Sequence, residues 1–308
     1  MTALLAEVVR SAYVEGSHYG SVLALRPDGS AALALGDLER PIFPRSCNKP
    51  LQAIALLDTG WQPTREEHVA LAASSHSGEP GHLAFVQEVL GDLVLQTPPL
   101  APLNEAAWHT ILRAGGAATP LTMNCSGKHA AMLRTCALNG WSLQDYLDPA
   151  HPVQQACKQT IESIAGEPVL HTAVDGCGAP QHALSLTGLA RAFGRLAAAD
   201  LHTTARRTAD AMRTHPWYVG GTGRDVTALM EGVPGLVAKD GAEGVYAVGL
   251  ADGSAVALKI SDGSERARMP VLVAALRALG VEADVLEQYA ATPVLGGGRP
   301  VGAVRVAF

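Results

Sequence analysis

Near the start of the chain stands Arg45-Ser46-Cys47-Asn48-Lys49-Pro50, which leads into an apolar run at residues 51–57. Pro50 has no N–H group and is tolerated only in the first turn of a helix, so the helix cannot begin much before Ser46. Ser46 is therefore predicted at the helix N-terminus, with Lys49 one turn along on the same face. A neutral Lys49 amine there could accept the Ser46 proton, which would pair a nucleophile with an adjacent base.

Strand patterns lie on both sides of this segment, and helical patterns fill the middle of the chain. From about residue 50 to residue 212, apolar residues recur at helical spacing, and another helix is predicted near 265–279. Short β-rich runs separated by turn residues, including Glu15-Gly16-Ser17 and Pro27-Asp28-Gly29, predict antiparallel hairpins. The predicted strands are 6–14, 19–25, 31–35, 235–238, 245–250, 255–260 and 301–306.

The two groups of strands predict a single architecture. Because the edges of an isolated hairpin need partners, strands from both ends of the chain are expected to join in one antiparallel sheet faced by helices. The predicted class is α/β of the α+β type, with one catalytic domain over residues 1–308. Within it, a sheet subdomain would take about 1–60 and 232–308, and a mainly helical subdomain about 61–231.

Composition limits the partners and the compartment. The 308 residues are 48% apolar and carry a formal charge of -6, so the chain can bury a large core but has no basic footprint for nucleic acid or an anionic membrane. No apolar run approaches the roughly 18 residues of a spanning helix, and the start has no basic export signal. The five cysteines are far apart, which favours reduced thiols or metal ligands. We expect a cytoplasmic protein whose partner is a small molecule or a second copy of itself.

Two further motifs accompany the Ser-X-X-Lys, which by itself is common by chance in long chains. The segment Ser74-Ser75-His76-Ser77-Gly78-Glu79 follows an apolar run. It could be either part of an active site that is lined with hydroxyl groups or an ordinary helix cap or turn. Lys239 ends a second apolar run, and could be either a site residue or a solvated lysine in a turn. A Ser-X-X-Lys, a second serine cluster and a Lys-X-Gly on a late strand are the three elements of serine β-lactamases and penicillin-binding proteins.

A third constellation has the residue types of a metal site. It combines Asn124-Cys125-Ser126-Gly127-Lys128-His129 with Asp175-Gly176-Cys177-Gly178, whose thiols, amine and imidazole could converge on a soft cation such as zinc. No Cys-X-X-Cys or His-X-X-X-His is present, so spacing alone favours two loop cysteines that never meet. Cys136 and Cys157 lie in helical patterns and are predicted to be buried apolar thiols.

Six ordered blocks together resemble one family. The chain is similar to the Rhizobium-type, thermolabile L-asparaginases, also called class 3, of the asparaginase II family, over residues 14 to about 260. That resemblance implies a fold similar to serine β-lactamases and glutaminases. The blocks are 14–18, 45–50, 73–79, 124–129, 175–180 and 237–244.

The resemblance also implies an activity and roles for individual residues. The activity would be hydrolysis of L-asparagine to L-aspartate and ammonia, in a protein that is expected to form a homodimer. Two Ser–Lys pairs would activate a serine for attack on the side-chain amide, with Ser46 the expected nucleophile. A zinc ion without a catalytic role would be held by two thiolates and a neutral lysine, with occupancy falling at acid pH. The implied catalytic residues are Ser46, Lys49, Ser75 and Lys239; the implied zinc ligands are Cys125, Lys128 and Cys177; and Asp175 is implied near the substrate's amino group.

Some features leave alternatives open. His129 could adjoin the substrate or simply begin a helix, while Cys47, Asp240 and Glu243 depart from the pattern expected of the family. A different serine acyl-transfer hydrolase, such as a glutaminase, a β-lactamase-like enzyme or an esterase, is the first competing interpretation. A non-catalytic ligand sensor on the same fold is the second, although the presence of both serines and both lysines disfavours it.

Overall fold

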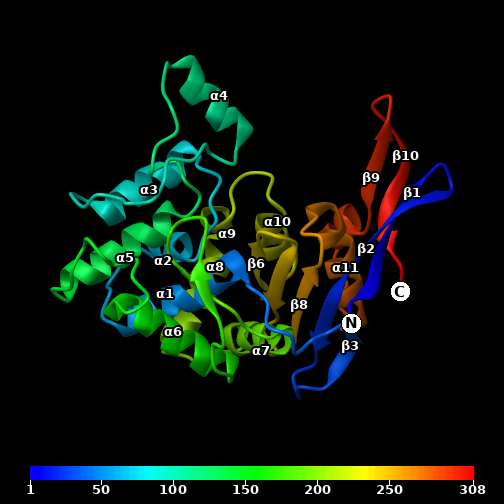
Figure 1. Cartoon of the computed structure of the whole chain (residues 1–308), viewed down its shortest axis with the longest axis horizontal. Helices are drawn as coiled ribbons and strands as arrows, with labels where there is room; N and C mark the ends of the chain where they lie inside the picture. Colours follow the sequence, from blue (N-terminus) through cyan, green and yellow to red (C-terminus); the bar gives the residue numbers. More distant parts are fainter.

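Strands from the two ends of the chain form one antiparallel sheet in the computed structural model, which covers residues 1–308 (Figure 1). The strand order is β6-β7-β8-β2-β1-β10-β9, and β3 pairs with β2 beside β1. The predicted sheet, shared between both termini, is confirmed. Its strands are β1 (Ala3–Arg10), β2 (Tyr13–Leu25), β3 (Ala31–Leu35), β6 (Val237–Gly241), β7 (Val245–Gly249), β8 (Ala255–Ile260), β9 (Thr292–Gly296) and β10 (Arg299–Val306).

Helices cover both faces of the sheet. Helix α7 (Leu186–Ala197) packs on β2, β7 and β8, and α11 (Arg268–Ala278) packs on β2, β8 and β10. Successive side chains of a strand point to opposite faces, so Leu23 of β2 packs in the cluster with α7, whereas Val22 packs in the larger cluster with α11. The central strands are therefore buried on both sides, which accounts for their nearly continuous apolar sequence.

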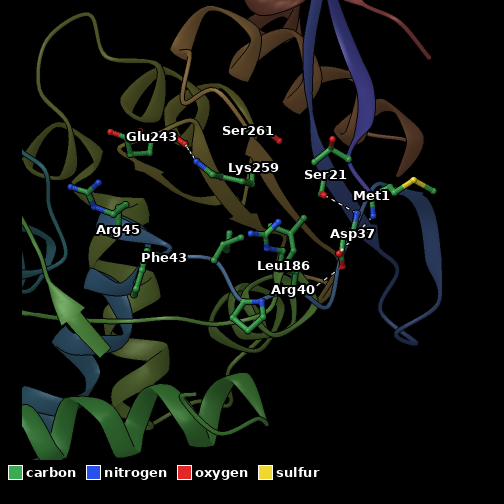
Figure 2. Close-up of a pocket in the computed structure, with 13 residues that line it drawn as sticks. Met1, Ser21, Asp37, Arg40, Phe43, Arg45, Leu186, Glu243, Lys259 and Ser261 are labelled. Atoms are coloured by element: carbon green, nitrogen blue, oxygen red, sulfur yellow. Dashed lines mark hydrogen bonds and ion pairs between the residues drawn. The ribbon is translucent and has the colours of Figure 1, made fainter. Parts of the chain in front are cut away.

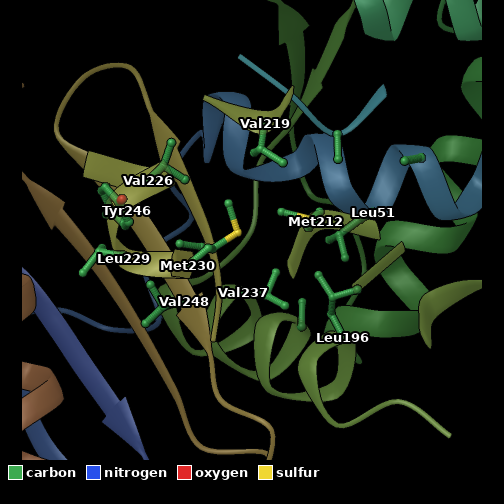
Figure 3. Packing of buried hydrophobic residues seen from close by; sticks show 14 of the residues in the cluster. Leu51, Leu196, Met212, Val219, Val226, Leu229, Met230, Val237, Tyr246 and Val248 are labelled. Carbon is green, nitrogen blue, oxygen red and sulfur yellow. The ribbon is translucent and has the colours of Figure 1, made fainter. Parts of the chain in front are cut away.

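The middle of the chain forms a helical layer beside the sheet. Helix α1 falls within the residue range predicted for the sheet subdomain, but it packs against α5, α6 and α8. The hydrophobic core is continuous across the two parts: Leu51 and Met212 from the helices lie near Val237 of β6 (Figure 3). The remaining elements are η1 (Arg45–Asn48), α1 (Lys49–Asp58), α2 (Glu66–Ala72), α3 (Pro80–Leu90), α4 (Glu105–Arg113), α5 (Ser126–Leu138), α6 (Pro152–Ala165), β4 (Thr172–Val174), β5 (Pro180–His182), α8 (Thr204–Thr214), α9 (Pro216–Val219), α10 (Asp225–Gly232), η2 (Glu265–Ala267) and η3 (Asp284–Tyr289).

The first hairpin differs from the prediction. The turn lies at Ser11 and Ala12, which both have positive φ (46° and 68°), and β2 runs without a break through Glu15-Gly16-Ser17. The predicted turn at residues 15–17 is therefore wrong. Residues 13–17 lie in a hairpin that projects from the sheet with most of its side chains exposed, so their polarity resembles that of a loop (Figure 1). The short strands β4, β5 and β9 were also not predicted.

The helices are short. The longest, α6, has 14 residues, and none has the length and apolarity needed to cross a membrane.

Candidate active site

Ser46 and Lys49 lie at the start of the helical layer, as the position of Pro50 predicts. Ser46 is in the short helix η1 and is half-buried, and Lys49 is the first residue of α1. The lysine points inward and is only 2% exposed. No hydrogen bond joins Lys49 to Ser46. The Lys49 amine instead reaches the segment that follows α2.

Lys49 contacts the second serine cluster. Its Nζ donates to the backbone oxygen of Ser74 at 2.6 Å and to Ser75 Oγ at 3.1 Å. No carboxylate lies within ion-pair distance of this amine, and a lysine is almost never fully buried without a charged partner. An uncompensated buried amine that contacts a hydroxyl is typical of a reactive site rather than of a core.

Lys239 lies on β6, an edge strand of the sheet, and is completely buried. Its Nζ donates to the backbone oxygen of Asp240 at 2.8 Å and forms an ion pair with the Asp240 carboxylate. Burial lowers the pKa of Lys239, the Asp240 charge opposes this effect, and the nearby charge of Lys49 adds to it. Cys47 Sγ donates to the Lys239 carbonyl at 3.1 Å, so β6 is tied to the helix that carries Ser46.

Arg224 is a component of this site that the sequence analysis missed. It donates to Asp240 Oδ2 at 2.7 Å and to the Ser75 carbonyl at 3.4 Å, and so connects the second serine to the Lys239–Asp240 pair. Burial by itself raises the pKa of Asp240, but the charges of Lys239 and Arg224 outweigh it and leave that pKa below its usual value. The glycine-rich stretch at residues 220–223 just before Arg224 was the available signal.

The two loop cysteines meet, contrary to what spacing alone favours. Lys128 Nζ donates to Cys177 Sγ at 3.2 Å, and all three expected metal ligands are buried. A hydrogen bond from Cys125 lowers the pKa of Cys177 against the effect of burial, and the Lys128 charge lowers it further. The pKa of Lys128 is raised, because the charges of Cys177, Cys125 and Asp175 exceed the opposing effect of burial.

Asp175 and His129 adjoin this cluster. Asp175 accepts a hydrogen bond from Arg45 Nε at 2.8 Å and a weaker one from the Cys177 thiol at 3.7 Å. His129 Nδ1 lies 2.8 Å from the Tyr146 hydroxyl, while its Nε2 is buried with no hydrogen-bond partner. Burial and the Lys128 charge lower the pKa of His129 to about 4, so the ring is neutral near pH 7.

The donor set can be compared with what a metal ion requires. No group of three or more His, Cys, Asp or Glu residues is arranged to hold a metal ion. The expected set contains only two such residues, and its third member is a lysine. The sulfurs of Cys125 and Cys177, the Lys128 amine and the unpartnered Nε2 of His129 are nonetheless donor types that a soft divalent cation binds.

The cysteine cluster and the Ser–Lys cluster are neighbours. The hydrogen bond with Cys177 and burial raise the pKa of Cys125, and the charge of Lys49 opposes this rise. The same charge adds to the effect of burial that lowers the pKa of His129, so Lys49 lies close to both groups. All nine residues that the sequence analysis singled out therefore fall in one region, between β6 and the N-terminal ends of α1 and α5. Their individual roles stay predictions.

Comparison with known proteins now adds the family. Residues 6–306 match the model of the L-asparaginase II family. The chain belongs to this family. The predicted resemblance to the asparaginase II family is thereby confirmed. No curated protein matches it significantly.

The similarity to solved structures is distant. Mglu in its native form is 14% identical with a TM-score of 0.46, over 85% of this chain and 64% of Mglu. A β-lactamase from Mycobacterium bovis is 15% identical with a TM-score of 0.45, over 88% of this chain and 94% of the β-lactamase. The asparaginase II family member thus spans less than two thirds of the length of Mglu.

We expect Arg224→Gln to lower kcat for amide hydrolysis about tenfold to hundredfold with little change in KM, because a lost charge-assisted hydrogen bond is worth roughly 1.5–3 kcal/mol. The substitution removes the link between the Ser75 backbone and Asp240, so the pH–rate profile should shift as well. Arg206→Gln, which removes an exposed ion pair with Asp210, is the matched control. A lower Tm with unchanged kinetics would show that Arg224 is only structural.

Proposed function

We propose that this protein hydrolyses L-asparagine to L-aspartate and ammonia through a serine nucleophile. One observation carries the proposal: Lys49 is buried, lacks a carboxylate partner and donates to Ser75 Oγ, one helical turn from Ser46. Membership of the L-asparaginase II family supports an amide as the substrate.

In the proposed reaction, Ser46 Oγ attacks the carboxamide carbon of the substrate and gives its proton to a lysine. Free N–H groups at the helix start around Ser46 stabilise the negative oxygen that develops. A lysine then protonates the leaving nitrogen as ammonia departs, and water releases aspartate from the acyl-enzyme. Ser75, in contact with Lys49, provides a hydroxyl through which the proton can pass, and Lys239 supplies positive charge held in place by Asp240.

Asp175 is the proposed partner of the substrate's ammonium group. Its carboxylate is only about 10% exposed and is oriented by Arg45, so it can offer an oxygen to a cation with little reorganisation. His129, neutral and with a free Nε2, is a proposed neighbour of the substrate in the same region.

We expect L-asparagine to be cleaved and L-glutamine to have a kcat/KM lower by about tenfold to hundredfold, because one added methylene moves the amide away from a serine fixed at a helix end. The measurement is ammonia release from L-asparagine, L-glutamine and D-asparagine. Nitrocefin and a p-nitrophenyl ester test the competing acyl-transfer activities. Absence of ammonia from millimolar L-asparagine with zinc present would refute the proposal.

We also propose that Cys125, Lys128 and Cys177 hold one zinc ion per chain. When bound, zinc would supply local positive charge, and the three residues would be locked together across the two loops that carry them. Asp175 lies two residues before Cys177, so ordering these loops would position the ammonium partner.

Removing the metal should therefore raise KM more than it lowers kcat, as measured by kinetics after chelation and readdition. Metal analysis should show about one zinc per chain in the wild type and a loss in Cys125→Ser and Cys177→Ser. Cys136→Ser is the matched control, since Cys136 is also completely buried but belongs to the hydrophobic core. Equal zinc in all four proteins would exclude these ligands.

The homodimer and the cytoplasmic location stay predictions. Sedimentation of the purified protein and fractionation of cells that produce it would test them.

A further inference from the structure

A separate pocket lies on the sheet side of Arg45, between the segment 37–45, the β6–β7 turn and the adjoining ends of β2 and β8. Its volume is about 410 Å³, within the range of small-molecule sites. None of Ser46, Lys49, Ser75 or Lys239 lines it. Figure 2 shows Arg45 and Glu243 near one end of the pocket, Lys259 between, and Arg40 and Asp37 toward the other end.

The charges on its wall are incompletely paired. Lys259 is half-buried on β8, and its Nζ donates only to the backbone oxygen of Glu243. Arg40 and the Glu243 carboxylate take part in no ion pair within the protein, while Asp37 accepts a hydrogen bond from the backbone of Arg40 at 3.1 Å. Burial lowers the pKa of Lys259, and the charges of Glu243 and Asp262 only partly offset this effect, while the charge of Arg45 adds to it. An anion bound beside the Lys259 amine would favour its charged form.

The balance of these charges indicates the kind of ligand. The Met1 ammonium group also lines the pocket and pairs with Asp37 at 3.8 Å. Arg45 pairs with Asp175. Arg40 and Lys259 are therefore the two cations left to face the Glu243 carboxylate. A molecule that carries two carboxylates and one ammonium group, with a net charge of about −1, complements this set. An anion without an ammonium group would bring negative charge next to the Glu243 carboxylate. An amino acid with a single carboxylate would leave either Arg40 or Lys259 without a partner.

We propose that this pocket binds an acidic amino acid, with its carboxylates on Lys259 and Arg40 and its ammonium group on Glu243. The inference rests on the proposed function in one respect only: the expected product, L-aspartate, is a molecule of this class. Arg45 lines the pocket and also pairs with Asp175, so a bound amino acid would lie next to the residue that orients the proposed substrate site.

The test is calorimetric titration of the full chain with L-aspartate and with succinate, which has both carboxylates but no ammonium group. We expect Lys259→Gln to weaken the binding of both molecules about tenfold, the effect of losing one charge-assisted hydrogen bond. Glu243→Gln should weaken L-aspartate by a similar factor and leave succinate unchanged or tighter. Lys158→Gln, on the surface of α6, is the matched control and should change neither.

Binding of L-aspartate that is unaffected by both Lys259→Gln and Glu243→Gln would place it in the catalytic site and overturn the proposal, as would absence of binding. Equal losses for L-aspartate and succinate in Glu243→Gln would overturn the assigned ammonium contact. The titration measures binding and needs no turnover. Its result can therefore be interpreted even if the protein does not hydrolyse L-asparagine. Ammonia release by Lys259→Gln should match that of the wild type.

Discussion

Ser46→Ala is expected to lower kcat for L-asparagine at least about a thousandfold, because an alanine methyl group cannot form the acyl-enzyme. Ser75→Ala should cost nearly as much if the two hydroxyls belong to one proton-transfer unit, since the effects of such residues are not additive. The measurement is ammonia release under saturating substrate, together with a thermal melt of each variant.

Ser74→Ala is a matched control from the same cluster. The Ser74 hydroxyl is fully buried but has no hydrogen-bond partner, so its loss should leave both turnover and stability near the wild type. A Ser46→Ala enzyme that keeps most of its activity would exclude Ser46 as the nucleophile. Loss of activity in Ser75→Ala alone would then assign that role to Ser75, which already accepts a hydrogen bond from Lys49.

Lys49→Met should lower kcat by about a hundredfold to ten-thousandfold, the usual contribution of a positioned general base. Methionine fills a similar volume and preserves the packing of α1, whereas Lys49→Ala would also open a cavity. Removal of an amine that is buried without a charged partner should leave Tm unchanged or raise it. Reduced activity without reduced stability would distinguish a catalytic lysine from a structural one.

Two further lysines complete this experiment. Lys239→Met should also abolish most turnover, but with a loss of stability, because it leaves Asp240 paired with Arg224 alone. Lys158→Met on α6 removes a partly exposed lysine that pairs only with Glu162, and it should affect neither property. Full activity in Lys49→Met would contradict the Ser–Lys mechanism even if Ser46 proved essential.

Local patterns were sufficient for the architecture and for the start of α1. Alternating and continuous apolar runs predicted most of the central strands, because a strand buried on two faces between α7 and α11 has a strongly apolar sequence. Pro50 predicted where α1 begins, because the lack of an N–H group restricts proline in any context. The exposed start of β2 was mistaken for a turn, since its strand conformation depends on pairing with β1 rather than on its own residues.

Contacts between distant segments decided how the site is connected. Lys49 bonds Ser75, 26 positions away, rather than Ser46, and Lys128 bonds Cys177, 49 positions away, although spacing alone argued that the cysteines do not meet. Arg224 joins Asp240 to Ser75 only because α10, β6 and the segment after α2 converge. Residue types and motifs identified most residues of the candidate site. The direction in which a long side chain reaches, however, is set by the burial and charge of its neighbours. Those neighbours are assembled only by the tertiary fold.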